Sequence, residues 1–196
     1  MAPYRIRIFG DPVLKQRATE ITDIDGRLVK LSEDMVTTLR GVAGLGLAAP
    51  QVGVQKRLFV YQMDEDDDPQ VLVNPTISDS RGEWEFEEGC LSLPGLYFPI
   101  VRPKEVHLTG YDLQGREVSI EADELLARLF QHELDHLEGR LLLEYLDKGQ
   151  RKSAMKELRR RELEGGRSAG RMLRGSTDER VRAGAGGGEP PDTWEL

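Results

Sequence analysis

The sequence lacks the features that mark secreted and membrane proteins. Its 196 residues include a single cysteine, Cys90, so an internal disulfide framework is excluded and a reducing compartment is expected. No run approaches the roughly 20 consecutive apolar residues of a membrane-spanning helix. The first residues also contain no continuous apolar segment of the kind that directs secretion. We therefore expect a cytoplasmic protein with no membrane partner.

Charge is distributed unevenly along the chain. Residues 1–146 hold 15 basic and 26 acidic residues, whereas residues 147–182 hold 12 basic and 6 acidic residues. The acidic body is a poor match for nucleic acid, but the basic segment is a candidate contact for a polyanion. Beyond Gly165 the chain is rich in glycine and arginine without periodicity. We therefore expect one domain over residues 1–164 and a disordered tail over residues 165–196.

Hydrophobic patterns predict both helices and strands. Apolar residues at spacings of three and four predict an amphipathic helix over residues 26–40. Further patterns predict strands at 57–63 and 70–73, a hairpin of 104–112 with 117–121, and helices at 123–137 and 148–164. The glycine-rich stretch 41–53 is expected to interrupt any regular element. We expect an α+β fold in which short antiparallel sheets surround a central helix, residues 123–137, followed by a C-terminal helix.

The helix at 123–137 contains an H-E-x-x-H motif formed by His132, Glu133 and His136. Two histidines four residues apart lie on one face of a helix, so both imidazoles can bind the same metal ion. Glu133 lies on the adjoining flank, where it can accept a proton from a metal-bound water. The alternative is a structural pair of core histidines, which is disfavoured because buried imidazoles are costly without partners. The motif therefore predicts a metal site.

A catalytic metal site usually has three protein ligands and one open position. Residue types leave three kinds of candidate for the third ligand. A glutamate of the charged helix, Glu157 or Glu162, would suit a thermolysin-like protease, and His107 lies in a predicted strand. Cys90 follows Gly89, which permits a close backbone approach, although a lone cysteine is more often a small buried side chain.

Three segments together resemble the signature motifs of the peptide deformylase family. They are GLGLAAPQ at 44–51, EGCLS at 88–92 and QHELDHLEG at 131–139, in the order and spacing of that family. The opening GDPVL at 10–14 is also similar, and the likeness extends over about residues 3–160. The resemblance implies a metal-dependent hydrolase that removes the N-formyl group from the initiator methionine of newly made polypeptides and releases formate.

The resemblance also implies which residues bind the metal. Cys90, His132 and His136 match the three ligand positions of the family and would leave a fourth tetrahedral position for water. The metal would be Fe²⁺, one per chain, with Zn²⁺, Ni²⁺ or Co²⁺ also able to occupy the site. Glu133 would take the proton of the water and return it to the departing amine.

Further positions match the groups that contact the substrate in the family. The side-chain amide of Gln51 and the backbone N–H of Leu91 would stabilise the oxyanion formed by attack on the formyl carbon. The methionine side chain would enter an apolar pocket, although each apolar residue assigned to it is equally explicable as core. The residues expected around the substrate are Gly46, Leu45, Phe86, Gly89, Leu125 and Leu129.

Partners follow from the same resemblance. The nascent formyl-Met polypeptide is the expected substrate, and the basic helix at 148–164 is a candidate contact with the ribosome, as for family members that dock through a C-terminal helix. We expect a monomer. Two other functions remain open: a zinc peptidase whose third ligand is not Cys90, and a catalytically inactive protein associated with the ribosome or RNA. The presence of Glu133, Gln51 and all three candidate ligands favours the deformylase.

Overall fold

The computed structural model describes residues 4–42, 44–161 and 163. The chain divides into two compact units, residues 1–154 and 155–196. The strands and helices α1 and α2 all lie in the first unit. The predicted tail, 165–196, lies outside the described residues. Within the described residues, no helix is long and apolar enough to cross a membrane.

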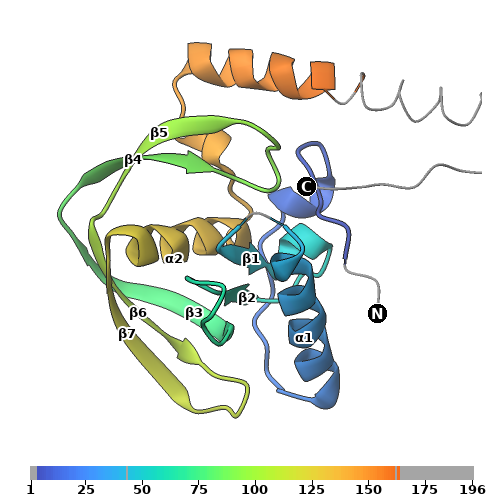
Figure 1. Cartoon of the computed structure of the whole chain (residues 1–196), viewed down its shortest axis with the longest axis vertical. Coiled ribbons are helices and arrows are strands. Elements are labelled where there is room, and N and C mark those ends of the chain that lie inside the picture. Colours follow the sequence, from blue (N-terminus) through green and yellow to red (C-terminus); the bar gives the residue numbers. More distant parts are fainter. Residues whose placement is uncertain (1–3, 43, 162, 164–196) are drawn as a thin grey trace, which may run out of the picture. The chain divides into compact units, whose positions relative to one another are not determined.

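The strands of the first unit form two antiparallel sheets (Figure 1). The larger sheet has the strand order β1-β2-β3-β6-β7. Strands β4 and β5 pair only with each other and form a second sheet of two strands. The strands are β1 (Gly46–Ala48), β2 (Leu58–Tyr61), β3 (Gln70–Arg81), β4 (Trp84–Gly89), β5 (Tyr97–Arg102), β6 (Glu105–Tyr111) and β7 (Glu117–Asp123).

Two helices pack against the larger sheet. Helix α1 (Gly26–Arg40) begins after Asp25, whose carboxylate accepts hydrogen bonds from the backbone N–H groups of Arg27 and Leu28. Helix α2 (Glu124–Leu137) follows β7 directly. Short 3₁₀ turns lie at Pro12–Lys15 (η1), Ala49–Val52 (η2) and Leu142–Glu144 (η3), and residues 148–161 are also helical.

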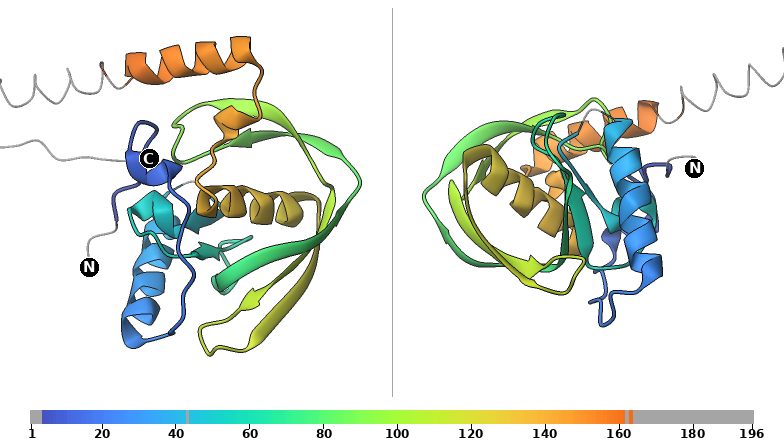
Figure 2. Two further views of the ribbon diagram at one scale, coloured as in Figure 1. Left: turned by 180° about the vertical axis from the view of Figure 1, so that it is seen from behind. Right: turned by 60° about the horizontal axis from the view of Figure 1, so that its bottom comes forward.

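Strand β2 separates two hydrophobic clusters. Phe59 and Tyr61 face α2, where Phe130 contacts both rings at centroid distances of 6.0 and 5.3 Å. Leu58 and Val60 alternate with them and belong to the cluster around α1. All four residues of β2 are buried, because the two helices cover its opposite faces (Figure 2).

The α+β class with antiparallel sheets is confirmed, but some expected elements differ. The helix at 26–40 and the hairpin β6–β7 have the predicted positions. The expectation that 41–53 holds no regular element is wrong, because β1 pairs with β2 there and η2 follows it. The sequence patterns also did not predict β4 and β5, since the four glutamates around residues 83–88 resemble a solvated loop and β5 is interrupted by Pro99.

Candidate metal centre and active site

The two histidines of the motif lie on the last turns of α2, and Cys90 directly follows β4. The Nε2 atoms of His132 and His136 are 3.2 Å apart, and His136 Nε2 is 3.2 Å from Cys90 Sγ. All three candidate ligand atoms lie within 4.8 Å of one another. Among the described residues, this is the one group of three or more histidine, cysteine or acidic side chains that could hold a metal ion.

The donor set fits a tetrahedral metal. Two nitrogen ligands with bonds of ~2.0–2.1 Å are about 3.3 Å apart at the tetrahedral angle, close to the observed separation of the two Nε2 atoms. His132 Nδ1 lies 2.6 Å from Glu88 Oε1, which places the imidazole proton on Nδ1 and leaves the Nε2 lone pair facing the cluster. Burial would raise the pKa of the Cys90 thiol, but the adjacent imidazoles hold it well below its ordinary value and favour the thiolate.

The other candidates for the third ligand lie elsewhere. His107 is on β6, where its two ring nitrogens are 3.0 Å from Ser78 Oγ and 2.7 Å from Ser119 Oγ. Glu157 forms ion pairs with Arg160 and Arg161 at 2.6 and 2.7 Å. Glu162 lies outside the described residues. Of the candidates among the described residues, Cys90 alone joins the two histidines.

Glu133 lies beside the cluster, and its carboxyl occupies space left free by the absence of a side chain at Gly46. Its side chain is buried, and its Oε2 atom has no hydrogen-bond partner among the described residues. A Cβ atom at Gly46 would collide with Glu133 Oε1 and lie 2.9 Å from Cδ, so the carboxyl occupies the space that a side chain at residue 46 would take. Burial raises the pKa of Glu133 to about 7, against the opposing effect of the two imidazoles.

Glu88 connects the cluster to buried arginines that the sequence motifs did not identify. Its Oε1 atom meets His132, and its two carboxylate oxygens accept hydrogen bonds of 2.9 Å each from Arg102. Arg128 adds a second cationic partner at 2.7 Å. Burial would raise the pKa of Glu88, yet the hydrogen bonds from His132 and Arg102 hold it well below its usual range. The carboxylate therefore stays charged behind the candidate ligand.

The network continues from Arg102 to the far side of α2. Arg102 Nη1 donates to Asp135 Oδ2 at 2.9 Å and to the Tyr145 hydroxyl at 3.0 Å, and this hydroxyl donates to Asp135 at 2.8 Å. The guanidinium of Arg102 lies 4.5 Å from the centroid of the Tyr145 ring. Asp135 lies between the two histidines in the sequence. This position within the motif is a local indication that its side chain is buried near them. No local pattern pointed to Arg102, because its partners are distant in the chain.

Gln51 and Leu91 lie next to Cys90. Gln51 is 1% exposed, and its Oε1 atom accepts a hydrogen bond of 2.8 Å from the N–H of Ala48. Its amide nitrogen consequently points toward Ser92 Oγ at 3.3 Å and Cys90 Sγ at 4.0 Å. Leu91 follows Cys90 and packs in part against the cluster around α1.

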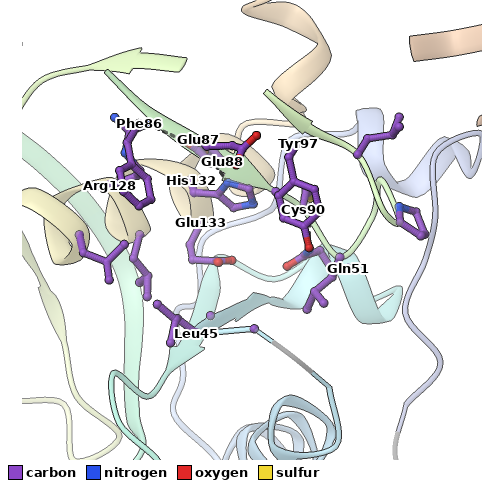
Figure 3. Close-up of a pocket in the computed structure, with 18 of the residues that line it drawn as sticks. Leu45, Gln51, Phe86, Glu87, Glu88, Cys90, Tyr97, Arg128, His132 and Glu133 are labelled. Carbon is purple, nitrogen blue, oxygen red and sulfur yellow. Dashed lines mark hydrogen bonds and ion pairs between the residues drawn. The ribbon is translucent and has the colours of Figure 1, made fainter. Parts of the chain in front are cut away.

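A cavity of about 530 Å³ opens beside these residues (Figure 3). It is lined by Gln51, Cys90, Leu91, His132 and Glu133, whereas His136 lies behind them. Leu45, Phe86 and Leu125, three of the residues expected around the substrate, are more than one third exposed, so they are not core residues. All six positions expected around a substrate line this cavity: Leu45, Gly46, Phe86, Gly89, Leu125 and Leu129.

Gly89 and Tyr97 form part of the cavity rim. The aromatic ring of Tyr97 lies over Gly89, where a Cβ atom would be 2.6 Å from Tyr97 Cε1. Tyr97 is 64% exposed and lines the cavity with Leu96. A side chain at residue 89 would therefore displace the aromatic ring from this position.

A buried carboxyl between two imidazoles that converge with a thiolate, open to a cavity on one side, is the arrangement of a metal-dependent hydrolase. Comparison with known proteins identifies the family of metal-dependent hydrolases to which the chain is similar. The family model for polypeptide deformylase matches residues 3–152. The peptide deformylase of Acidothermus cellulolyticus is 46% identical over 165 residues, which are 84% of this chain and 91% of that protein. The peptide deformylase of Clostridium botulinum is 49% identical over 144 residues, 74% of this chain and 97% of that protein.

Solved structures of peptide deformylases are also similar to this chain in fold and sequence. The crystal structure of a peptide deformylase from Legionella pneumophila has a TM-score of 0.81 and 38% identity, covering 85% of this chain and 99% of that chain. A peptide deformylase from Ehrlichia chaffeensis in complex with actinonin has a TM-score of 0.79 and 37% identity, covering 83% and 99%. The chain belongs to the peptide deformylase family. It is thus a hydrolase of protein biosynthesis that removes the N-formyl group from newly made polypeptides.

Proposed function

We propose that Cys90, His132 and His136 hold the metal ion on which this deformylase depends, and that Glu133 is its general acid and base. The observation that carries the proposal is the convergence of the three ligand atoms within 4.8 Å beside a buried carboxyl. When bound, the metal would lower the pKa of a water molecule and polarise the formyl carbonyl. In this arrangement α2 acts as the central helix of the catalytic fold.

Glu133 moves the proton in both halves of the reaction. It accepts a proton from the attacking water and delivers that proton to the departing amine nitrogen, which leaves as a free N-terminus beside formate. Burial raises the pKa of Glu133 above its ordinary value, which favours a carboxyl that can both accept and release a proton. The glycine at residue 46 leaves the carboxyl the room that it needs.

Gln51 and Leu91 stabilise the oxyanion. The bond from Ala48 N–H to Gln51 Oε1 orients the amide, so its N–H groups face the side of Cys90. A donor held in place before the reaction costs no reorganisation when charge develops on the formyl oxygen. The backbone N–H of Leu91 is the second donor, since this residue follows Cys90 and lines the same cavity.

The substrate methionine occupies the apolar end of the cavity. Phe86 on β4 and Leu125 and Leu129 on α2 line this end, together with Leu45. Gly46 and Gly89 allow the backbone of the substrate to pass close to the cluster. Exposed apolar residues at a cavity mouth favour an apolar ligand, because their burial on binding stabilises the complex.

We infer that the native metal is Fe²⁺, one ion per chain. The inference is supported by the likeness to the deformylase family. Two imidazoles and one thiolate suit divalent iron, and Zn²⁺, Ni²⁺ and Co²⁺ can occupy the same donors in purified protein.

We further propose that the basic segment 148–164 contacts the ribosome, so that a cytoplasmic monomer acts on nascent formyl-Met chains. Five lysines and arginines between 148 and 159 are exposed in the described part of this segment. Such a surface suits the phosphates of ribosomal RNA. The proposed ligands and substrate contacts all come from one chain, so the proposed site needs no residue of a second copy.

The test is metal analysis of anaerobically purified protein together with formate release from formyl-Met-Ala-Ser. We expect one metal ion per chain, loss of activity with a chelator and its return with Fe²⁺. Cys90→Ser should weaken metal binding and abolish most activity, because a neutral hydroxyl is a poor replacement for thiolate. His107→Ala is the matched control and should retain the metal. Full metal occupancy in Cys90→Ser would contradict the ligand assignment.

A further inference from the structure

Arg128 is a buried cation in the wall of the substrate cavity. It lies on α2 one turn before His132, is 3% exposed and lines the cavity with Leu125 and Leu129. An apolar side chain at this position would fill the same wall without a buried charge, whose desolvation is costly. The guanidinium therefore needs an explanation beyond packing.

The contacts of Arg128 all reach the inward-facing residues of β4. Its Nη1 atom donates to Glu88 at 2.7 Å, and Nη2 donates to the backbone carbonyl of Trp84 at 2.6 Å. The guanidinium carbon lies 5.0 Å from the centroid of the Trp84 ring and 5.7 Å from that of Phe86. Trp84 and Phe86 stack on each other with a centroid distance of 4.8 Å. One side chain thus binds three alternate residues of the strand.

Strand β4 depends on such contacts for its distance from α2. It pairs only with β5, so no backbone hydrogen bond of the larger sheet fixes its position. The planar guanidinium holds Glu88 and the Trp84 carbonyl in a rigid fork, which a flexible or apolar side chain cannot do. Its remaining nitrogen, Nε, is buried without a hydrogen-bond partner among the described residues, so the two terminal nitrogens set its orientation.

This distance is also the width of the apolar end of the cavity. Phe86 and Arg128 lie close together in the wall of the cavity (Figure 3). Phe86 lines that end from β4, whereas Leu125 and Leu129 line it from α2. We propose that Arg128 is a positioning residue that sets the specificity for the first residue of the substrate, by fixing the wall that carries Phe86 against α2. The inference rests on the proposed function, in which this end takes the methionine side chain.

A fixed distance between β4 and α2 would determine which side chain the first residue of the substrate can have. An unbranched thioether can enter a narrow apolar slot, whereas a phenylalanine ring needs the two walls to separate. Discrimination by the fit of a hydrophobic pocket reaches roughly 10–200-fold for small differences in size. A wall that can move would lose contact with methionine and admit the larger ring.

The test compares kcat and KM for formyl-Met-Ala-Ser and formyl-Phe-Ala-Ser. In Arg128→Met we expect KM for the methionine substrate to rise about tenfold with a smaller change in kcat, and the preference for methionine over phenylalanine to fall about tenfold. Arg128→Lys keeps a charge for Glu88 but cannot also reach the Trp84 carbonyl in the same geometry. We expect its KM and its preference for methionine to be intermediate between those of the wild type and Arg128→Met. If Arg128→Met does not fold, Arg128→Lys alone tests the inference.

Arg57→Met is the matched control. Arg57 is also buried and also joins a carboxylate to a backbone carbonyl, binding Glu138 at 2.6 Å and the Pro75 carbonyl at 3.0 Å away from the cavity. It should lose stability but keep the methionine preference. Metal content should stay at the wild-type level in all variants, because Arg102 still binds Glu88.

Two results would overturn the inference in distinguishable ways. An unchanged methionine-to-phenylalanine ratio in the folded Arg128 variants would show that Arg128 has a structural role only. A wild-type enzyme that deformylates both peptides equally well would contradict the assignment of the pocket, and the role of Arg128 with it.

Discussion

The carboxyl of Glu133 lies against the backbone of β1, where residue 46 is a glycine. A methyl group at that position would collide with the carboxyl oxygen rather than with backbone. The carboxyl can turn away, so the collision displaces the proposed proton acceptor at little cost to the fold. A misplacement of about 1 Å in a catalytic group lowers turnover by about 10²-fold. We expect this loss in kcat for Gly46→Ala, measured with formyl-Met-Ala-Ser.

The control for Gly46→Ala is Gly26→Ala. Gly26 opens α1, and a Cβ atom there would meet nothing within 4 Å. Thermal unfolding of both variants should stay near that of the wild type, with activity lost only in Gly46→Ala. A Gly46→Ala enzyme with wild-type turnover would mean that the position of the Glu133 carboxyl does not limit the reaction.

Glu133 itself gives a second prediction at the residue scale. Glu133→Gln keeps the shape of the side chain and removes its capacity to accept a proton. General acid–base catalysis contributes typically ~10²–10⁴-fold, and we expect kcat to fall by this factor while the metal content stays unchanged. Parallel metal analysis is essential, since a loss of metal would explain the same loss of activity. Near-normal turnover in a metal-loaded Glu133→Gln enzyme would remove this residue from the mechanism.

At the scale of elements, buried charges join α2 to the sheet of β4 and β5. Arg102 on β5 binds Glu88 on β4 and Asp135 on α2, and all three side chains are buried. Removing one partner of a buried ion pair costs about 3–5 kcal/mol when the other charge stays buried without compensation. Without Arg102, Glu88 keeps Arg128 and Asp135 keeps Arg140. We therefore expect Arg102→Met to lower the free energy of unfolding by the lower end of that range, about 3 kcal/mol, measured by urea denaturation.

Arg102→Met should also weaken metal binding. Residues that orient a metal ligand typically contribute 10–100-fold to affinity, and Arg102 holds the carboxylate that binds His132 Nδ1. Arg81→Met is the control, because Arg81 forms an exposed ion pair with Glu105 on the larger sheet. It should change neither stability nor metal affinity appreciably. Equal effects of the two substitutions would mean that the buried network is dispensable.

The elements that were predicted are those whose patterns are local. Helix α1 has a regular apolar stripe, and β6 and β7 alternate on both sides of a turn at Gly115. Strand β1 was missed because its three residues are defined only by pairing with β2. Strand β4 was missed because its glutamates resemble a solvated loop, although Glu88 is buried.

The residues of the candidate site likewise fall into two groups, those predicted from local motifs and those that depend on contacts between distant elements. The histidine spacing on one helix is a local signal, and the resemblance between motifs connected it to Cys90. Arg102, Arg128 and the burial of Glu88 depend on which strand meets which helix, and no motif records that pairing. The residues that hold the candidate ligands in place therefore could not be predicted from the sequence, whereas the candidate ligands themselves could.

At the scale of the whole molecule, the charge of the chain and its chemistry are separated in sequence. Every residue of the candidate site precedes residue 140, and the basic segment begins after residue 147. Contacts with RNA phosphates release counterions and depend steeply on salt, whereas a buried catalytic site responds weakly to moderate salt. Peptide hydrolysis and ribosome binding should therefore respond independently to changes in the C-terminal segment.

Two shortened chains and one full-length variant test this separation. A chain ending at Gly165 should deformylate formyl-Met-Ala-Ser and sediment with ribosomes like the intact protein. A chain ending at Asp147 should lose ribosome binding. A full-length chain with Lys148, Arg151, Lys152 and Lys156 changed to glutamine keeps the helical segment and removes four exposed cations.

The salt series identifies the cause of any loss. Each phosphate contact contributes about −0.7 to −0.9 to the slope of the logarithm of affinity against the logarithm of salt concentration. If all four cations contact phosphates, the glutamine variant should reduce the magnitude of that slope by about 3, with unchanged peptide hydrolysis. A slope equal to that of the wild type would exclude these four side chains as phosphate contacts. Loss of binding only in the chain ending at Asp147 would then assign the interaction to the rest of the segment, which includes the exposed residues Arg159, Arg160 and Arg161.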